Sequence, residues 1–471
     1  MKKISSLGFS YLAFSLFIYL FFFRPGIAMR VSGDFDDRAY LCGAQKWVGI
    51  TSEACPQTSH FTGVAVTWFP ALVLARIFSS LTSDPFEAWA GFWVGLTSFL
   101  CWMASLFLID KIIQLYLKQW DDSPARTFLS SGHFPILFLM NIPVLYFATT
   151  RTFMVHTVEL FWALLFLYFL KRGRFLWGLV SLAVLLATRP INLGACFLFP
   201  AFLLESITSI KIPKKGLVAI FATILVAALF VLVKMAVTGY HETFVIPLIL
   251  DFKIESLWAF LFAQDFGLVW SQFVWLFAFL LWGRYFKRCS AVLAAAGFWM
   301  FVSGLTGLFW PTRGGTFGYR YLIGSYAAVL LVFLETAPYW SFFFGSKSTK
   351  LLKILLVSGA LWGAVQCWIY PAPKPYWPWD KPLHTQLGLP YGQVFSWIKQ
   401  TPDLAKMNRF SQAGQFLERL GLISQSEFTR QGGVRGYALE GSVGQFNFFL
   451  TGVLAIATLF RSVTQWIRRK I

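Results

Sequence analysis

Charged residues are scarce in this sequence. Asp, Glu, Lys and Arg make up 13% of the 471 residues, whereas 57% are hydrophobic and 19% are aromatic. The mean hydropathy is +0.63. Soluble domains carry about 25% charged residues, so this shortage argues against a soluble protein. Many apolar stretches reach the roughly 20 residues that cross a bilayer. The sequence therefore predicts an all-α integral membrane protein.

Cysteine is also sparse, and internal repeats and low-complexity tracts are absent. Cys42 and Cys55 share one loop, and neither their spacing nor their neighbours suggest a metal site. A disulfide between them is expected if the loop faces an oxidising compartment, and two free thiols are the alternative. The basic residues Lys2 and Lys3 precede an apolar run without a small-residue cleavage site, which predicts an uncleaved first helix.

The apolar stretches predict about twelve transmembrane helices. They lie at 7–23, 88–109, 133–148, 154–170, 175–188, 191–207, 216–238, 266–283, 290–309, 319–337, 351–370 and 444–461.

The net charge of +19 does not indicate a nucleic-acid partner, because the basic residues lie between the apolar stretches and are not clustered on a soluble module. With the N-terminus inside, every segment that this topology places inside is basic, as the positive-inside rule requires. A crossing by the apolar stretch 64–80 would turn the later basic loops outward. We therefore predict that this stretch is an interfacial helix in the first periplasmic loop and that both termini are cytoplasmic.

The predicted domain organisation follows from this topology. Residues 1–370 form a membrane-embedded catalytic module that includes the first periplasmic loop, 24–87. Residues 371–443 form a periplasmic loop or small lid, rich in Pro and Trp at its start. Residues 444–471 contain the last transmembrane helix and a basic cytoplasmic tail.

Three carboxylates follow the first predicted span, at Asp34, Asp36 and Asp37. Like charges this close repel one another unless a cation or a proton-transfer role balances them. We predict these aspartates as catalytic residues, with Asp34 preferred as general base because it is nearest the span. Asp34 and Asp36 are also candidate ligands of a divalent cation, Mg²⁺ or Mn²⁺, although no cofactor is required. The alternative is a solvated loop in which Arg38 pairs with an aspartate.

Three arginines are predicted to bind a phosphate: Arg189, Arg313 and Arg320. A planar guanidinium binds phosphate through two parallel hydrogen bonds and keeps its charge. Arg313 and Arg320 bracket three glycines whose backbone can approach a ligand closely, and Arg189 precedes a proline at a helix end. The alternative is that these side chains extend to lipid headgroups.

Four further residues are predicted to bind an acceptor or substrate: His60, Arg151, His156 and Glu159. His156 and Glu159 are three residues apart and so share a helical face. Arg151 and His156 flank the turn into the fourth predicted span. Ionisable groups at membrane depth are costly, so each is a functional candidate by default. A purely structural His156–Glu159 pair is the alternative.

Four segments together resemble one family. They are GDFDDRAYL at 33–41, the segment from HF to WFP at 60–70, PVLYFAT with MVHT within 143–157, and GTFGYRYL at 315–322. In this order the chain is similar to membrane-embedded glycosyltransferases of the GT-C type. The nearer likeness is to the bacterial branch related to protein O-mannosyltransferases and the lipid A aminoarabinose transferase. The resemblance covers most of residues 1–340 and nothing after 371.

The resemblance implies an activity and a location. A polyprenyl-phosphate sugar is the donor, and a glycolipid, glycan or protein is the acceptor. Outward-facing arginines, here Arg189, Arg313 and Arg320, hold the donor phosphate, and a first-loop aspartate activates the acceptor for inverting transfer. The location is the bacterial inner membrane, in contact with membrane lipids, with the site facing the periplasm.

Two other functions are weighed against this one. An O-antigen ligase or polymerase also has about twelve spans, but its key arginines lie in the late loop, here Arg409, Arg419, Arg430 and Arg435. A non-enzymatic lipid or solute transporter is expected to show repeat symmetry and charges at the membrane midplane. The predicted charges instead gather at one interface.

Overall fold

A computed structural model describes most of the first 207 residues and several later segments. The described residues are 6–23, 35–50, 63–82, 84–118, 124–149, 151–207, 254–262, 267–285, 290–309, 320–340, 353–361, 363–364, 445–446, 449–454 and 456–457.

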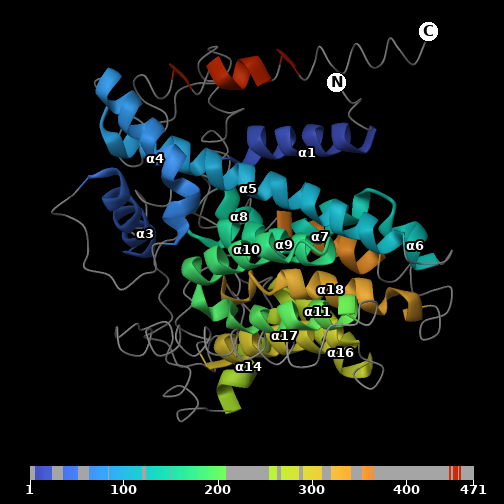
Figure 1. Cartoon of the computed structure of the whole chain (residues 1–471). Coiled ribbons are helices and arrows are strands. Elements are labelled where there is room, and N and C mark those ends of the chain that lie inside the picture. The colour runs from blue at the N-terminus through green and yellow to red at the C-terminus, as the bar shows by residue number, and fades with distance from the viewer. Residues whose placement is uncertain are drawn as a thin grey trace, which may run out of the picture.

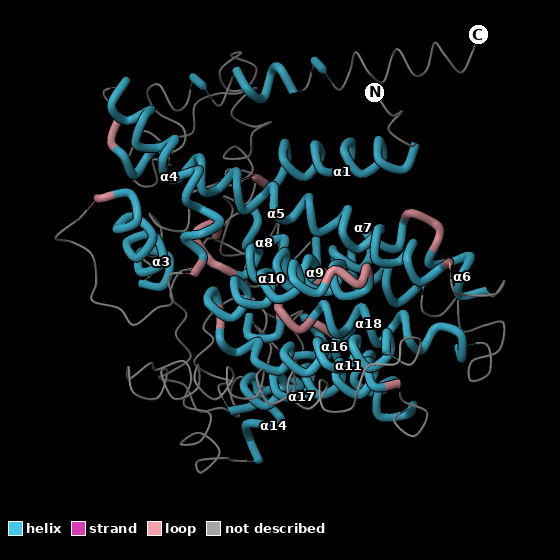
Figure 2. The backbone as a smooth tube through the Cα atoms, viewed as in Figure 1, coloured by secondary structure: helices cyan, strands magenta, loops and turns pink. Residues whose placement is uncertain are grey.

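Every regular element in these residues is a helix (Figure 2). The α-helices are α1 (Ser6–Phe22), α3 (Phe35–Gln45), α4 (Val64–Leu81), α5 (Phe86–Leu117), α6 (Pro124–Leu129), α7 (His133–Met140), α8 (Val144–Thr149), α9 (His156–Lys171), α10 (Phe175–Thr188), α11 (Leu198–Ile207), α14 (Ile254–Phe262), α15 (Leu268–Ser271), α16 (Phe273–Tyr285), α17 (Ala291–Phe309) and α18 (Tyr326–Thr336). The 3₁₀ helices are η1 (Lys46–Val48), η2 (Pro190–Phe197), η5 (Arg320–Leu322) and η6 (Ala337–Tyr339).

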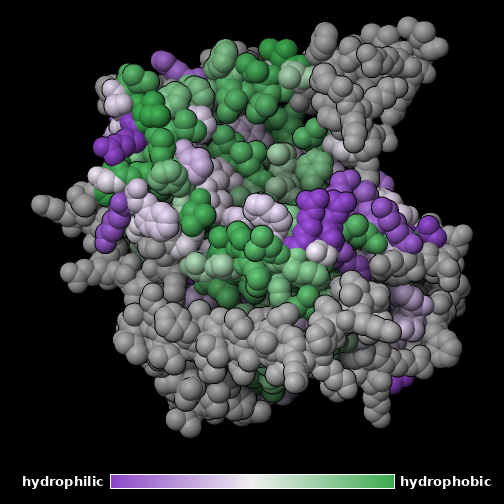
Figure 3. All heavy atoms as spheres, in the orientation of Figure 1, coloured by the Kyte–Doolittle hydropathy of each residue, from purple (hydrophilic) through white to green (hydrophobic). Residues whose placement is uncertain are grey.

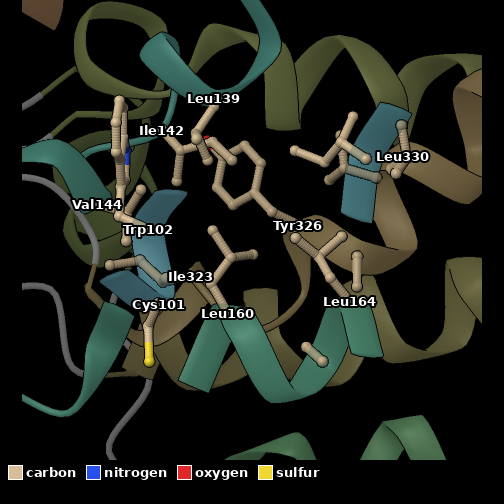
Figure 4. Packing of buried hydrophobic residues seen from close by; sticks show 14 of the residues in the cluster. Cys101, Trp102, Leu139, Ile142, Val144, Leu160, Leu164, Ile323, Tyr326 and Leu330 are labelled. Carbon is tan, nitrogen blue, oxygen red and sulfur yellow. The ribbon is translucent and has the colours of Figure 1, made fainter. Parts of the chain in front are cut away.

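The helices stack as a bundle around α9 and α18 (Figure 1). Helix α9 packs between α5 and α10, and α18 packs against α16 and α17. Residues 326–334 of α18 are all fully buried, so this helix contacts protein on every side. Figure 4 shows Tyr326 at the start of α18 among the side chains of Leu139, Ile142, Leu160 and Ile323. A helix that is apolar all round and fully enclosed belongs at the centre of such a bundle.

Within the described residues, two helices are long and apolar enough to cross a membrane, α4 and α5. Exposed apolar side chains lie along α4 and α10, and Figure 3 shows apolar groups across much of one face of the described part. These observations support membrane association. The segment 64–80 is thus a complete helix of spanning length, and its predicted interfacial placement stays a prediction, as do the twelve spans and their sidedness.

Several predicted spans are interrupted helices. The stretch 133–148 breaks into α7 and α8 at Asn141, where Pro143 has no backbone N–H to continue the ladder. The Asn141 amide nitrogen instead donates to the carbonyls of Leu137 and Leu356 over 2.7 and 2.8 Å. The stretch 191–207 starts as the 3₁₀ helix η2 before α11 begins. The predicted span 216–238 lies outside the described residues.

Candidate functional site

The site is built where α9 begins and α10 ends. His156 is the first residue of α9, and Glu159 follows one turn later. Arg189 caps the C-terminal end of α10 in an extended conformation, with φ −152° and ψ 106°. The following Pro190 explains this, because proline disfavours the helical conformation of the residue before it. The chain then winds into η2, which carries Asn192 back toward α9.

Glu159 is the centre of a buried polar cluster. Its Oε1 accepts a hydrogen bond from Asn192 Nδ2 over 2.7 Å, and its Oε2 accepts one from Arg189 Nη1 over 3.3 Å. His156 Nδ1 lies 3.2 Å from the same Oε2. Glu159 and Asn192 are fully buried, and His156 and Arg189 are nearly so. A charge pair this deep is stable only when each charge is met by partners of this kind.

Arg189 also connects α9 to η5. Its Nη1 lies 3.1 Å from His156 Nδ1 and donates to the Arg320 carbonyl oxygen over 3.3 Å. His156 Nδ1 thus faces both the Arg189 guanidinium, which only donates, and the Glu159 carboxylate, which only accepts, so the tautomer of the ring decides which of the two contacts is a hydrogen bond.

Tyr321 lies between two guanidinium groups. The Cζ atoms of Arg189 and Arg320 are 5.0 and 5.3 Å from the centre of its ring. Arg320 Nη2 also donates to the Tyr321 hydroxyl over 3.4 Å. Cation–π attraction offsets part of the repulsion between two neighbouring cations. The aromatic ring therefore allows both arginines to be buried at one place.

Two glycines permit the close packing of this cluster. A Cβ at Gly324 would lie 2.0 Å from Asn192 Oδ1 and 2.7 Å from Glu159 Oε1. A Cβ at Gly63, which precedes α4, would lie 2.2 Å from the Ala187 carbonyl carbon and 2.6 Å from the Thr188 nitrogen. The start of α4 thus presses directly on the backbone that holds Arg189.

The structure brings together four of the predicted site residues: His156, Glu159, Arg189 and Arg320. Arg151 is buried on the turn before α9, where its backbone N–H donates to the Tyr146 carbonyl. Arg151 is close to His156 in the sequence, and its predicted role in substrate binding stays a prediction.

The predicted acidic cluster lies partly on a helix. Asp36 and Asp37 fall in the first turn of α3, and Cys42 on the same helix is disulfide-bonded. Asp34, Cys55, His60 and Arg313 lie outside the described residues, so the pairing of Cys42 with Cys55 and the roles of Asp34, His60 and Arg313 stay predictions. No group of three or more metal-binding side chains occurs in the part of the chain that the structure describes.

Two residues of the cluster were not predicted from the sequence, Asn192 and Tyr321. Asn192 is a lone amide within the apolar stretch 191–207, and such a residue at membrane depth is a signal that could have identified it. Tyr321 follows Arg320 in a segment rich in aromatic residues and carries no comparable signal.

The charge of the cluster indicates what it can bind. Arg189 and Arg320 supply two guanidinium groups, and Glu159 supplies one carboxylate, so the described cluster carries an excess of positive charge. Such an arrangement favours an anionic ligand, and guanidinium groups suit a phosphate in particular. Searches against known protein families, curated proteins and solved structures found no match to this chain.

Proposed function

We propose that this chain is a glycosyltransferase of the bacterial inner membrane that moves a sugar from a polyprenyl-phosphate donor to an acceptor on the periplasmic face. The proposal combines the segmental resemblance to GT-C transferases with the excess positive charge of the buried cluster. An anionic phosphate on a lipid chain fits both the apolar bundle and this cluster. The polytopic topology with both termini cytoplasmic belongs to the same proposal.

The buried pair of guanidinium groups is the observation that carries the proposal. Arg320, stacked on Tyr321, is placed to meet the donor phosphate. Arg189 contacts His156, Glu159 and the Arg320 carbonyl, so its part is to position Arg320 and to add positive charge. In this proposal Arg189 acts indirectly, and the direct phosphate contact predicted from the sequence is the alternative role. Cations preorganised in a site that excludes water stabilise charge that develops in a transition state.

The reaction breaks one bond and forms another at the anomeric carbon. The acceptor hydroxyl or amine loses its proton to a first-loop aspartate, Asp34 in our preferred assignment, and attacks the anomeric carbon from the face opposite the phosphate. The bond between this carbon and the phosphate oxygen breaks, and its electron pair leaves with the polyprenyl phosphate. The configuration of the sugar is inverted, and the charge on the departing phosphate is stabilised by Arg320 and, at longer range, by Arg189.

A deletion strain of the source bacterium tests this function. Mass spectrometry of its surface glycolipids and glycans is expected to show the loss of one hexose or pentose, which the wild-type gene restores. Asp34→Ala and Arg320→Lys are expected to be expressed but not to restore the sugar, the second because a lysine cannot replace a guanidinium fork. Lys111→Ala, on the exposed face of α5, is the matched control that restores it.

The same strain separates the rival functions. An O-antigen ligase or polymerase would tolerate Asp34→Ala and lose activity on substitution of Arg409, Arg419, Arg430 or Arg435. A transporter would leave the glycan composition intact. Full restoration by Asp34→Ala would therefore overturn the assignment of Asp34 as the base, and a deletion strain with unchanged glycans would overturn the proposed transferase.

A further inference from the structure

Buried hydroxyl groups in this chain commonly bond to the carbonyl four residues earlier. Thr149 Oγ1 donates to the Leu145 carbonyl over 2.7 Å, and Ser105 Oγ donates to the Cys101 carbonyl over 2.8 Å. The same bond is made by Thr336 to Val332. This satisfies a polar group that would otherwise be costly to bury.

Three threonines depart from this pattern: Thr152, Thr157 and Thr188. Their side chains are at most 1% exposed, and their hydroxyls have no hydrogen-bond partner among the described residues. Each of them directly adjoins a residue that the sequence analysis assigned to the site: Thr152 follows Arg151, Thr157 follows His156, and Thr188 precedes Arg189. Ser15 and Ser303 also lack partners in the described part, but they lie on α1 and α17.

Two of the segments that carry these threonines contact the N-terminal part of α4. Gly63 packs on the backbone of Ala187 and Thr188, and the Trp68 ring lies edge-on to Phe153 with centroids 6.4 Å apart. The Trp68 indole N–H is fully buried and also has no partner among the described residues. Unpartnered uncharged polar groups and an aromatic pair therefore occur on the segments that carry His156 and Arg189 and on the helix packed against them.

We propose that the hydroxyls of Thr152, Thr157 and Thr188 bind the hydroxyl groups of an uncharged sugar on the donor lipid. This inference rests on the proposed function and assigns the sugar subsite next to the phosphate. A sugar hydroxyl both donates and accepts, which is the complement of a threonine hydroxyl. An amino sugar would need a carboxylate, and Glu159, the carboxylate of the described cluster, already bonds Asn192 and Arg189.

The test compares two lipids of equal chain length, a polyprenyl phosphate that carries a hexose and the bare polyprenyl phosphate. Their affinities are measured for the full chain in lipid nanodiscs. The wild-type protein is expected to bind the hexose lipid at least tenfold more tightly. Thr157→Val and Thr188→Val preserve shape and remove one hydroxyl each, and each is expected to lower this ratio about fivefold with little effect on the bare lipid.

Thermal stability without ligand provides the second readout. Removing an unpartnered hydroxyl is expected to leave the midpoint temperature unchanged or raised, because no hydrogen bond is lost. Thr149→Val is the matched control, since its hydroxyl bonds the Leu145 carbonyl; its midpoint should fall while its lipid ratio stays at the wild-type value.

The outcomes distinguish the two proposals. A wild-type protein that binds neither lipid contradicts the transferase itself. If the wild-type protein prefers the hexose lipid and Thr157→Val and Thr188→Val keep this preference, the sugar subsite alone is overturned. A midpoint that falls in these variants as in Thr149→Val overturns it as well, because the hydroxyls would then serve the fold.

Discussion

Asn192 donates a 2.7 Å hydrogen bond from Nδ2 to Oε1 of Glu159, and both side chains are fully buried. The bond joins η2 to α9 across 33 positions of sequence. Asn192 Nδ2 also donates to the Arg189 carbonyl over 3.2 Å, so one amide fixes the carboxylate and the backbone that presents its cationic partner.

Asn192→Leu is therefore expected to destabilise the protein although leucine suits an apolar stretch. Glu159 would keep its burial and lose a donor, at a cost of about 1–3 kcal/mol. Unfolding of the purified protein in mixed detergent micelles measures this loss. Leu193→Ala, a packing change next in the chain, is the control for general damage and should leave the geometry around Glu159 intact.

Removal of the Glu159 side chain is expected to lower the free energy of unfolding far more than neutralisation of its charge. Glu159→Ala leaves the Arg189 guanidinium buried without its carboxylate, which costs about 3–5 kcal/mol. Glu159→Gln retains an oxygen acceptor and the side-chain shape, so its loss should be smaller. Free energies of unfolding for the two variants provide the measurement. Equal losses would contradict the assigned role of the Glu159 oxygen acceptors, because only the alanine variant removes every acceptor.

The packing at Gly63 is expected to leave no room for even one methyl group. In Gly63→Ala the new Cβ would overlap the Ala187 carbonyl, so α4 or the end of α10 must shift. The expected result is a loss of about 1–3 kcal/mol, the range typical of overpacking, together with reduced sugar transfer because Arg189 follows Thr188.

Gly283 on α16 offers the matched control, because a Cβ there would meet no atom within 4 Å. Alanine is the better helix former by about 1 kcal/mol, so Gly283→Ala should be neutral or stabilising. A loss in Gly283→Ala as large as that in Gly63→Ala would show that both variants report a general intolerance of alanine.

The contact between α1 and α5 yields a prediction remote from the site. Tyr11 Oη donates to Asp110 Oδ1 over 3.3 Å, and Gln114 Nε2 donates to Asp110 Oδ2 over 2.7 Å. Tyr11→Phe removes one bond and keeps the ring, so a loss of about 1 kcal/mol in unfolding free energy is expected. Sugar transfer by Tyr11→Phe should match the wild type, and a large drop in transfer would show that α1 placement affects the site.

Several helices could be predicted from hydropathy alone, and α10 matches the predicted range 175–188. The distant partners of the helix interruptions could not be predicted in this way. Pro143 marks the break at Asn141 in the sequence, but the Leu356 carbonyl that accepts a hydrogen bond from Asn141 Nδ2 lies 215 positions away. The break at Gln272 between α15 and α16 is accompanied by a hydrogen bond from the Tyr326 hydroxyl. Such partners belong to the three-dimensional packing, and a window of sequence does not contain them.

The candidate site likewise has a part that the sequence predicted and a part that depends on three-dimensional packing. The spacing of His156 and Glu159 predicted one helical face, and the structure places both on α9. The convergence of Arg189 and Arg320 on Tyr321 depends on how η2 and η5 approach each other, which no local pattern encodes. The structure shows that Arg189 Nη1 contacts Glu159, His156 and a backbone carbonyl, and its predicted role as a phosphate ligand stays a prediction.

Helix α5 has 32 residues and is about 48 Å long. Even at a tilt of about 40°, the upper end of the common range, its length along the membrane normal is about 37 Å. In the proposed topology α5 crosses a hydrocarbon layer only about 30 Å thick, so at least one turn of the helix would emerge into the headgroup region. The polar residues Asp110, Lys111 and Gln114 near the C-terminal end suit such an emerging turn. The Tyr11–Asp110 bond would then lie near the border of the bilayer and set the depth at which α1 is anchored.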